Sequence, residues 1–268
     1  MERRQLGRSG LDVPVVGMGT WKTFDVSDRS SIDQRRCIVD ICLEHGANLF
    51  DSSPMYGAAE HVLGETLTGR RDQALVATKV WTPDDAQAER QIQSALDYYN
   101  GIVDIYQVHN LVAWQKRLTS LERLRDNGSV RGVGITHYQH SAFGDLMQIM
   151  RSGRVESIQV PYNVRDRVVE DAVLPLAADL GIGVIIMQPL GTGRLAARAP
   201  DLAQLEPLKD FGVTTWSQAL LKWILSDTRV TTVIPATSRS EHAVQNIEAG
   251  SPPWFDAEQR AYVARLAQ

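Results

Sequence analysis

Eight short β-branched runs alternate with helical patterns along the whole chain, and this alternation limits the fold more than any other feature. The predicted strands begin near Val15, Asn48, Leu75, Val103, Gly132, Ser157, Gly183 and Val230. Most of these starts lie about 27 residues apart, as expected for the strand–helix units of an α/β (β/α)8 TIM barrel. No boundary interrupts the series, so we predict one barrel domain over residues 1–268.

The segments between these strands show the spacing of apolar residues that is typical of helices. The predicted helices cover residues 31–45, 58–67, 86–100, 114–127, 141–152, 168–180, 214–226 and 241–248. Gly46, Gly101, Gly128, Gly153 and Gly181 follow five of them, at the position where glycine best tolerates the left-handed backbone that ends a helix.

Three segments lie outside the repeated units. Residues 4–14 predict an N-terminal β-hairpin around Ser9 and Gly10 that closes the bottom of the barrel, and residues 252–266 predict an extra C-terminal helix outside it. The interval between the last two strands is unusually long, which makes residues 191–212 a long loop. The loop follows a strand and therefore lies at the C-terminal end of the barrel, where barrel ligands bind. We expect it to fold over a bound ligand.

Charge and composition exclude several classes of function. The net charge is 28 − 32 = −4, which disfavours nucleic-acid binding. No apolar run approaches the roughly 20 residues that a membrane-spanning helix needs. Cys37 and Cys42 lie too far apart along one predicted helix for a disulfide, and two free thiols fit a reducing cytoplasm. We predict a soluble cytoplasmic protein without a metal site, and the sequence indicates no oligomeric state.

Four ionisable side chains follow consecutive predicted strands. Asp51, Lys79 and His109 stand at three strand ends, and Tyr56 lies in the loop after Asp51. Side chains alternate along a strand, so these groups can all point into the barrel mouth. We expect Asp51 to keep Lys79 charged and Lys79 to lower the pKa of Tyr56, which makes Tyr56 a proton donor. His109 can then donate a hydrogen bond to a bound carbonyl oxygen.

Each of the four residues alone has an ordinary structural explanation. A strand-end lysine is usually a surface charge, an aspartate a turn cap, and a tyrosine or histidine a packed side chain. Four such groups in phase on three neighbouring strands favour a catalytic site instead.

The residues around this quartet form motifs that extend over nearly the whole chain in order. They lie in residues 17–21, 48–57, 77–81, 104–109, 128–134, 159–163 and 233–238. In these segments the sequence resembles the aldo-keto reductases. The resemblance implies a barrel reductase that binds a nicotinamide dinucleotide across the top of the barrel and passes hydride to an aldehyde or ketone. It also implies that Tyr56 is the general acid, that Lys79 and Asp51 adjust its acidity, and that His109 positions the substrate oxygen.

The resemblance assigns further residues to the nicotinamide half of the cofactor. Gln159 matches the glutamine that holds the carboxamide, and Asp51 would contact the ribose. Thr136 and His137 replace the usual Ser-Asn pair, so His137 alters the carboxamide contact. Met187 stands where many members place an aromatic ring, and its thioether offers a softer apolar face.

The phosphate and adenine contacts follow at the later strands. Residues 188–193 would line the pyrophosphate. Residues 238–241 fit a helix-capping box, which favours phosphate at the helix start, and Arg239 is the candidate for the 2′-phosphate. Ala236 replaces a frequent lysine, which weakens the preference for NADPH over NADH. Gln245 and Asn246 stand where the family usually has a Glu-Asn pair that faces the adenine. Asn246 matches this pair and Gln245 does not.

The full predicted cofactor set comprises Thr20, Trp21, Asp51, Thr136, His137, Gln159, Met187, Gln188, Pro189, Leu190, Gly191, Gly193, Ala236, Thr237, Ser238, Arg239, Gln245 and Asn246. Trp21, Trp81 and Trp114 each follow a strand and could form an aromatic wall for the substrate or serve as packing residues. The short C-terminal tail predicts an open pocket with broad selectivity.

The sequence is compatible with three functions. The leading prediction is an NADPH-dependent carbonyl reductase for which NADH is a second cofactor. The alternative is a catalytically weak NADPH-binding sensor or regulatory subunit, because a fold does not imply activity. A third hypothesis makes Lys79 a Schiff-base amine of an aldolase-like barrel.

Overall fold

Eight parallel strands form the barrel in a computed structural model that describes all 268 residues. The strands follow one another in chain order as β3 (Met18–Gly19), β4 (Leu49–Asp51), β5 (Leu75–Val80), β6 (Val103–His109), β7 (Val130–Thr136), β8 (Ser157–Pro161), β9 (Gly183–Met187) and β10 (Thr232–Val233). Bridges from Val16 to Val233 and from Gly19 to Ala236 join the first strand to the last. The predicted (β/α)8 barrel is therefore confirmed.

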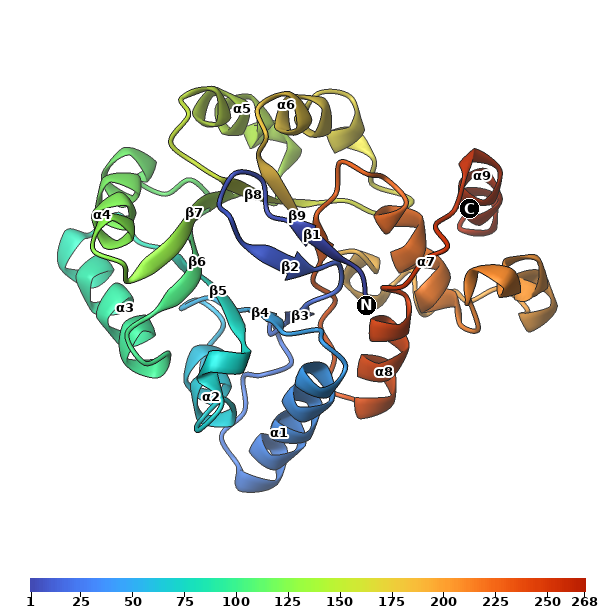
Figure 1. Ribbon diagram of the computed structural model, residues 1–268, viewed down its shortest axis with the longest axis horizontal. Coiled ribbons are helices and arrows are strands. Elements are labelled where there is room, and N and C mark those ends of the chain that lie inside the picture. The colour runs from blue at the N-terminus through green and yellow to red at the C-terminus, as the bar shows by residue number, and fades with distance from the viewer.

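Helices form an outer ring around the sheet (Figure 1). They are α1 (Arg29–Glu44), α2 (Ala59–Thr66), α3 (Asp85–Tyr98), α4 (Trp114–Asp126), α5 (Phe143–Arg151), α6 (Val173–Asp179), α7 (Trp216–Leu225) and α8 (Ser240–Glu248). The one predicted helix over residues 168–180 is divided into a 3₁₀ turn, η3 (Val168–Glu170), and α6. Pro175 explains the division, because proline is tolerated only in the first turn of a helix.

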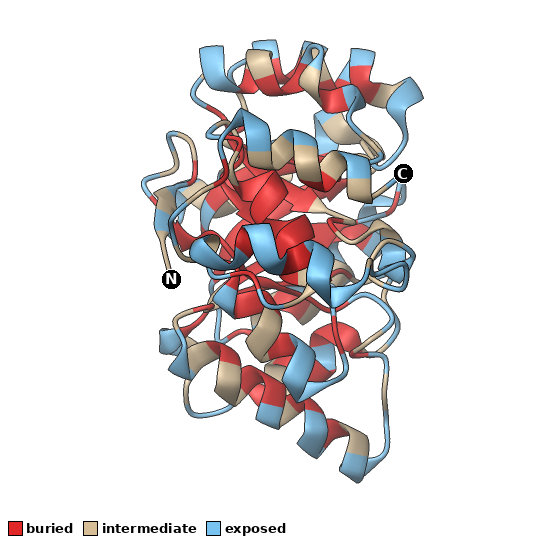
Figure 2. Ribbon diagram, turned by 90° about the vertical axis from the view of Figure 1, so that its right-hand side faces the viewer, coloured by how far each residue is buried: buried red, intermediate tan, exposed pale blue.

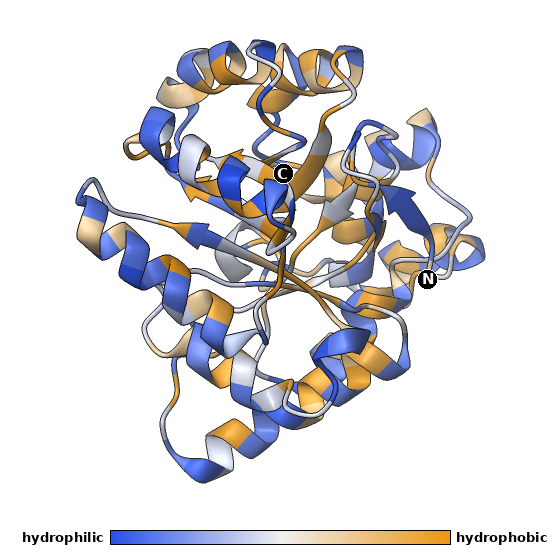
Figure 3. Cartoon of the chain, turned by 60° about the vertical axis from the view of Figure 1, so that its left-hand side comes forward, coloured by the Kyte–Doolittle hydropathy of each residue, from blue (hydrophilic) through white to orange (hydrophobic).

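The five glycines predicted to end helices all have positive φ angles, between 62° and 86°. Apolar residues dominate the strands, whereas the ring helices carry many polar residues on their outer faces (Figure 3). Burial is concentrated in the sheet and on the inner helix faces (Figure 2). No helix of the protein combines the length and the apolar character needed to cross a membrane.

The N-terminal hairpin seals the bottom of the barrel, as predicted. Its strands β1 (Arg3–Gln5) and β2 (Asp12–Pro14) pair antiparallel and lie across the barrel in Figure 1. Leu6, Leu11 and Val13 are buried against the inward side chains of the barrel strands. The fit is close, because a Cβ atom on Gly7 would lie only 2.4 Å from the backbone nitrogen of Gly183. The interior of the barrel is therefore closed at this end.

The long loop after β9 is more ordered than the sequence predicts. It contains the 3₁₀ segments η4 (Gly191–Gly193) and η5 (Leu202–Phe211). Leu205 and Leu208 are buried, and Tyr262 donates a hydrogen bond to the backbone oxygen of Gln204 at 2.8 Å. η5 thus packs at the outer edge of the molecule, beside α9 (Ala257–Leu266), in Figure 1. Only the first half of the loop remains available to cover a ligand.

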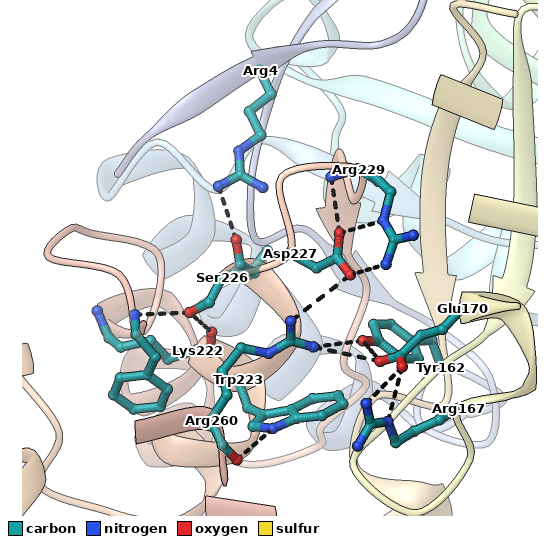
Figure 4. A network of polar contacts seen from close by, with 12 residues as sticks. Arg4, Tyr162, Arg167, Glu170, Lys222, Trp223, Ser226, Asp227, Arg229 and Arg260 are labelled. Carbon is teal, nitrogen blue, oxygen red and sulfur yellow. Dashed lines mark hydrogen bonds and ion pairs between the residues drawn. The ribbon is translucent and has the colours of Figure 1, made fainter. Parts of the chain in front are cut away.

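A polar network fixes the C-terminal helix α9 to the barrel (Figure 4). The guanidinium of Arg260 lies 4.5 Å from the ring centroid of Trp223 and donates to Tyr162 Oη at 2.8 Å. Tyr162 in turn donates to Glu170, which also pairs with Arg167 at 2.7 Å. Because Tyr162 directly follows β8, the helix is joined to the strand that carries Gln159.

Candidate active site

Three of the predicted catalytic residues stand at the ends of β4, β5 and β6, and their side chains lie on the same face of these strands. Leu49, Ala77 and Ile105 line the interior of the barrel. Asp51 and Lys79 lie two residues beyond the first two of these, and His109 lies four beyond the third. Side chains two or four residues apart on a strand share a face, so all three point into the barrel mouth.

Lys79 and Asp51 form a buried ion pair. Lys79 Nζ lies 2.8 Å and 2.7 Å from the two carboxylate oxygens of Asp51 and 2.7 Å from the backbone oxygen of Ser52. Burial alone would lower the pKa of Lys79, but the Asp51 carboxylate, together with Tyr56 and Glu60, outweighs burial and the pKa is raised. The ammonium group therefore stays charged, as predicted.

Tyr56 lies beside this ion pair. Lys79 Nζ is 5.3 Å from the centroid of the Tyr56 ring, and the ring meets that of His109 edge to face at 6.0 Å. Lys79 lowers the pKa of Tyr56, as predicted, but the expected net fall of that pKa below its ordinary value is wrong. Burial of the phenol raises its pKa by more than the positive charge of Lys79 lowers it. Tyr56 is therefore a neutral phenol that retains its proton.

His109 is an uncharged imidazole at physiological pH. Burial and the nearby charge of Lys79 lower its pKa to about 3, with a smaller effect from His137. The hydroxyl oxygen of Ser53 lies 2.9 Å from Nδ1 of the ring. Sequence reasoning did not single out Ser53, although it lies two residues after Asp51 in the same motif.

Asp51 also holds two amide side chains inside the barrel. Gln159 Nε2 donates to Asp51 Oδ1 at 2.8 Å, and Gln107 Nε2 approaches the same oxygen at 3.4 Å. Thr136 donates to Gln159 Oε1 at 3.5 Å, and Thr20 donates to the backbone oxygen of Asp51 at 3.0 Å. Four predicted residues therefore converge, and Gln107 joins them without having been predicted.

The segment after β9 bends back on itself close to the site. Gln188 has a φ of 54°, and its backbone oxygen accepts a hydrogen bond from Asn163 Nδ2 at 3.1 Å. The amides of Gly191 and Gly193 donate to Gln188 and Leu190 at 3.0 Å each. Both amides are thus engaged within the turn, so other groups of this segment must supply any phosphate contacts.

The start of α8 differs from the predicted capping box. Arg239, with φ −122°, is the N-cap residue, so Ser238 lies before the helix and its hydroxyl does not cap it. No side chain caps the first turn, and the Arg239 amide donates to Thr237 Oγ1 at 3.1 Å. The Arg239 side chain is exposed and pairs with Glu241 at 2.8 Å. The uncapped amide groups and the exposed guanidinium leave this helix end suited to an anion.

The remaining predicted residues lie around the mouth. Trp21 and Trp81 are each 41% exposed, and Trp81 lies 6.5 Å from His109 between ring centroids. Trp114 is half-buried and packs on the core at the start of α4. His137 stacks on Tyr138 at 5.7 Å. Asn246 is buried and Gln245 half-buried on α8, Met187 is half-buried at the end of β9, and Ala236 is bridged to Gly19.

Glu60 is a buried carboxyl group behind the site that the sequence did not reveal. It lies in the first turn of α2 and accepts a hydrogen bond from Thr78, the neighbour of Lys79. Burial raises its pKa from 4.5 to about 7, opposed by the Thr78 hydrogen bond and the charge of Lys79.

We expect Glu60 to make folding stability fall as the pH rises from 4.5 to about 7. In this range the unfolded chain releases the proton that the folded protein retains, and the accumulated loss is roughly 3 kcal/mol. Glu60→Gln should remove most of it in urea unfolding curves measured from pH 4.5 to 8. Glu65→Gln, on the same helix but paired with Arg29 at the surface, is the control. Equal pH dependence in all three proteins would contradict this assignment.

Comparison with known proteins places this geometry in a family. The model of the aldo/keto reductase family matches residues 15–268. Methylglyoxal reductase YeaE of Escherichia coli is 27% identical over 255 residues, which cover 92% of this chain and 89% of the relative. An NADH-specific methylglyoxal reductase of Escherichia coli is 25% identical and covers 93% of both chains. The crystal structure of an aldo/keto reductase from Klebsiella pneumoniae in complex with NADP and acetate matches with a TM-score of 0.83 at 23% identity, over 99% of this chain and 95% of that one.

The fold and the site define an α/β barrel with an acid–base cluster at the C-terminal ends of its strands. Since the family match extends over nearly the whole chain, the protein belongs to the aldo-keto reductase family. It is accordingly an oxidoreductase by family.

Proposed function

We propose that this protein reduces aldehyde and ketone carbonyls to alcohols with NADPH, and catalyses the reverse oxidation. The observation that carries the proposal is the buried Lys79–Asp51 ion pair next to the neutral Tyr56 phenol and the neutral His109 imidazole. An ammonium group fixed by its carboxylate partner beside two neutral, proton-bearing groups suits a carbonyl oxygen that gains negative charge. The names of the Escherichia coli relatives agree with this chemistry.

The residues at the barrel top fit a nicotinamide dinucleotide. Gln159 and Thr136 supply amide and hydroxyl groups near Asp51, which suits a carboxamide and a ribose. The uncapped first turn of α8 and the exposed Arg239 suit a phosphate at the other end. When bound, NADPH supplies the hydride.

The protein's own groups account for the proton. Tyr56 Oη gives its proton to the carbonyl oxygen, and the ammonium of Lys79 stabilises the phenolate that remains. His109 donates a hydrogen bond to the same oxygen and keeps the carbonyl oriented. The exposed rings of Trp21 and Trp81 offer apolar contact to substrates of varied shape, which favours broad selectivity.

The test is consumption of NADPH, followed by its near-ultraviolet absorbance, with methylglyoxal and an activated aromatic aldehyde, and with NADH in parallel. We expect turnover with both aldehydes and a preference for NADPH. Binding of NADPH without turnover across a panel of aldehydes and ketones would favour the sensor or regulatory subunit instead.

The structure disfavours the aldolase-like hypothesis for Lys79. A Schiff-base lysine needs a lowered pKa and access to substrate. Lys79 is completely buried, its pKa is raised, and its ammonium already donates to three oxygens. Borohydride treatment with substrate should therefore leave Lys79 unlabelled.

Arg239→Ala is expected to raise the KM for NADPH by about tenfold while changing the KM for NADH little, because only NADPH carries a 2′-phosphate for the guanidinium. Steady-state kinetics with both cofactors measure the difference. Arg265→Ala, an exposed arginine on α9, is the matched control. The same change in both KM values would remove Arg239 from phosphate recognition.

A further inference from the structure

A buried hydroxyl group holds one edge of the His109 ring. Ser53 Oγ lies 2.9 Å from Nδ1, and both side chains are buried. Ser53 follows β4, whereas His109 ends β6, so the contact reaches past β5, the strand that carries Lys79. The ring is therefore held from a neighbouring part of the barrel mouth and not from its own strand.

The surroundings of Ser53 decide which group donates in this hydrogen bond. The only other polar contact of Ser53 Oγ is the backbone amide of Met55 at 3.4 Å, which is itself a donor. The hydroxyl proton thus has one acceptor within reach, His109 Nδ1. If Nδ1 carried a proton, the oxygen would face two N–H donors and its own buried proton would have no acceptor, which is unfavourable. Ser53 therefore donates and Nδ1 accepts.

The charge of the ring then fixes where its proton lies. Burial and Lys79 keep the pKa of His109 at about 3, so the imidazole is neutral at physiological pH. A neutral imidazole has one N–H and one acceptor nitrogen. With Nδ1 as the acceptor, the proton is on Nε2. The hydrogen bonds within the protein leave Nε2 without a partner, on a ring that meets Tyr56 edge to face.

We infer that Ser53 is a positioning residue that locks His109 in the Nε2–H tautomer and so presents a single hydrogen-bond donor to the substrate oxygen. The tautomer is a property of the protein, whereas its consequence for catalysis rests on the proposed carbonyl reduction. In that reaction the oxygen receives hydrogen bonds from Tyr56 and His109, and only Tyr56 transfers its proton.

The tautomer is tested by long-range ¹H–¹⁵N correlation spectra of the full chain labelled with ¹⁵N-histidine. The His109 signals are assigned by their loss in His109→Asn. We expect a protonated Nε2 and an Nδ1 with the chemical shift of a hydrogen-bond acceptor. In Ser53→Ala, the chemical shift of Nδ1 should no longer be that of a hydrogen-bond acceptor, and both tautomers of His109 should be populated. Ser52→Ala removes a neighbouring buried hydroxyl that bonds to Thr20 at 2.9 Å and should leave the His109 signals unchanged.

Two spectra would overturn the inference: a protonated Nδ1 in the unaltered protein, or identical His109 signals in the unaltered protein and Ser53→Ala. Kinetics add a second readout, since Ser53→Ala should lower kcat by about tenfold and leave the Kd for NADPH unchanged. An unchanged kcat would overturn the catalytic consequence. If the unaltered protein reduces no carbonyl, the proposed function fails, while the spectra still decide the tautomer.

Discussion

Tyr56→Phe is expected to lower kcat for carbonyl reduction by about a thousandfold, the scale of a lost general acid. The substitution removes only the hydroxyl. The ring, which packs on the core and against His109, stays in place. No other group can replace the proton, because His109 with a pKa of about 3 is neutral and Lys79 is held by Asp51 and Ser52. Steady-state kinetics measure kcat, and fluorescence titration with NADPH should give an unchanged Kd.

Tyr262→Phe is the matched control for this experiment. Its hydroxyl donates a hydrogen bond to the backbone of Gln204, and it lies on α9 at the outer edge of the molecule. We expect its kcat to equal that of the unaltered protein. A Tyr56→Phe variant that loses cofactor affinity and rate in equal measure, or that keeps most of its rate, would contradict the role of Tyr56 as proton donor.

The barrel and the convergence of the four ionisable residues were predictable from the sequence, because both follow from regular spacings along the chain. Parallel strands repeat at a fixed interval, and side chains two or four residues apart point the same way, so Asp51, Lys79 and His109 could be placed at one mouth. The hairpin plug was predictable for a similar reason, since a short strand, a turn and a second short strand suit only the open end of the barrel.

The features that the sequence did not predict depend on how deeply side chains are buried and on contacts between residues far apart in the chain. The sign of the Tyr56 pKa shift was wrong because burial, which outweighs Lys79, is not encoded in the spacing of charges. Ser53 and Glu60 escaped notice because their partners lie 56 and 18 residues away. The capping box at residues 238–241 had the right residue types, but the extended backbone of Arg239 moved the cap by one position.

Lys79→Met is expected to destabilise the fold by about 3–5 kcal/mol, because it leaves the Asp51 carboxylate buried without its charged partner. Lys79 is fully buried and bonds to both oxygens of Asp51, so water cannot readily replace it. Urea unfolding measures the loss. Lys116→Met is the control, since its exposed pair with Asp85 should contribute less than about 1 kcal/mol. Equal losses in the two variants would show that the buried pair is not a structural requirement.

The double change Lys79→Met with Asp51→Asn separates folding from chemistry. It removes both charges, so no unpaired carboxylate remains and we expect most of the stability to return. Activity should not return, because nothing then stabilises the phenolate of Tyr56. The pKa of that phenol rises further, since Lys79 lowers it by more than Asp51 raises it. A stable double variant with kcat near that of the unaltered protein would contradict the role of the ion pair in proton transfer. A stable but inactive double variant would show that the fold does not need the buried ion pair and that the pair serves catalysis.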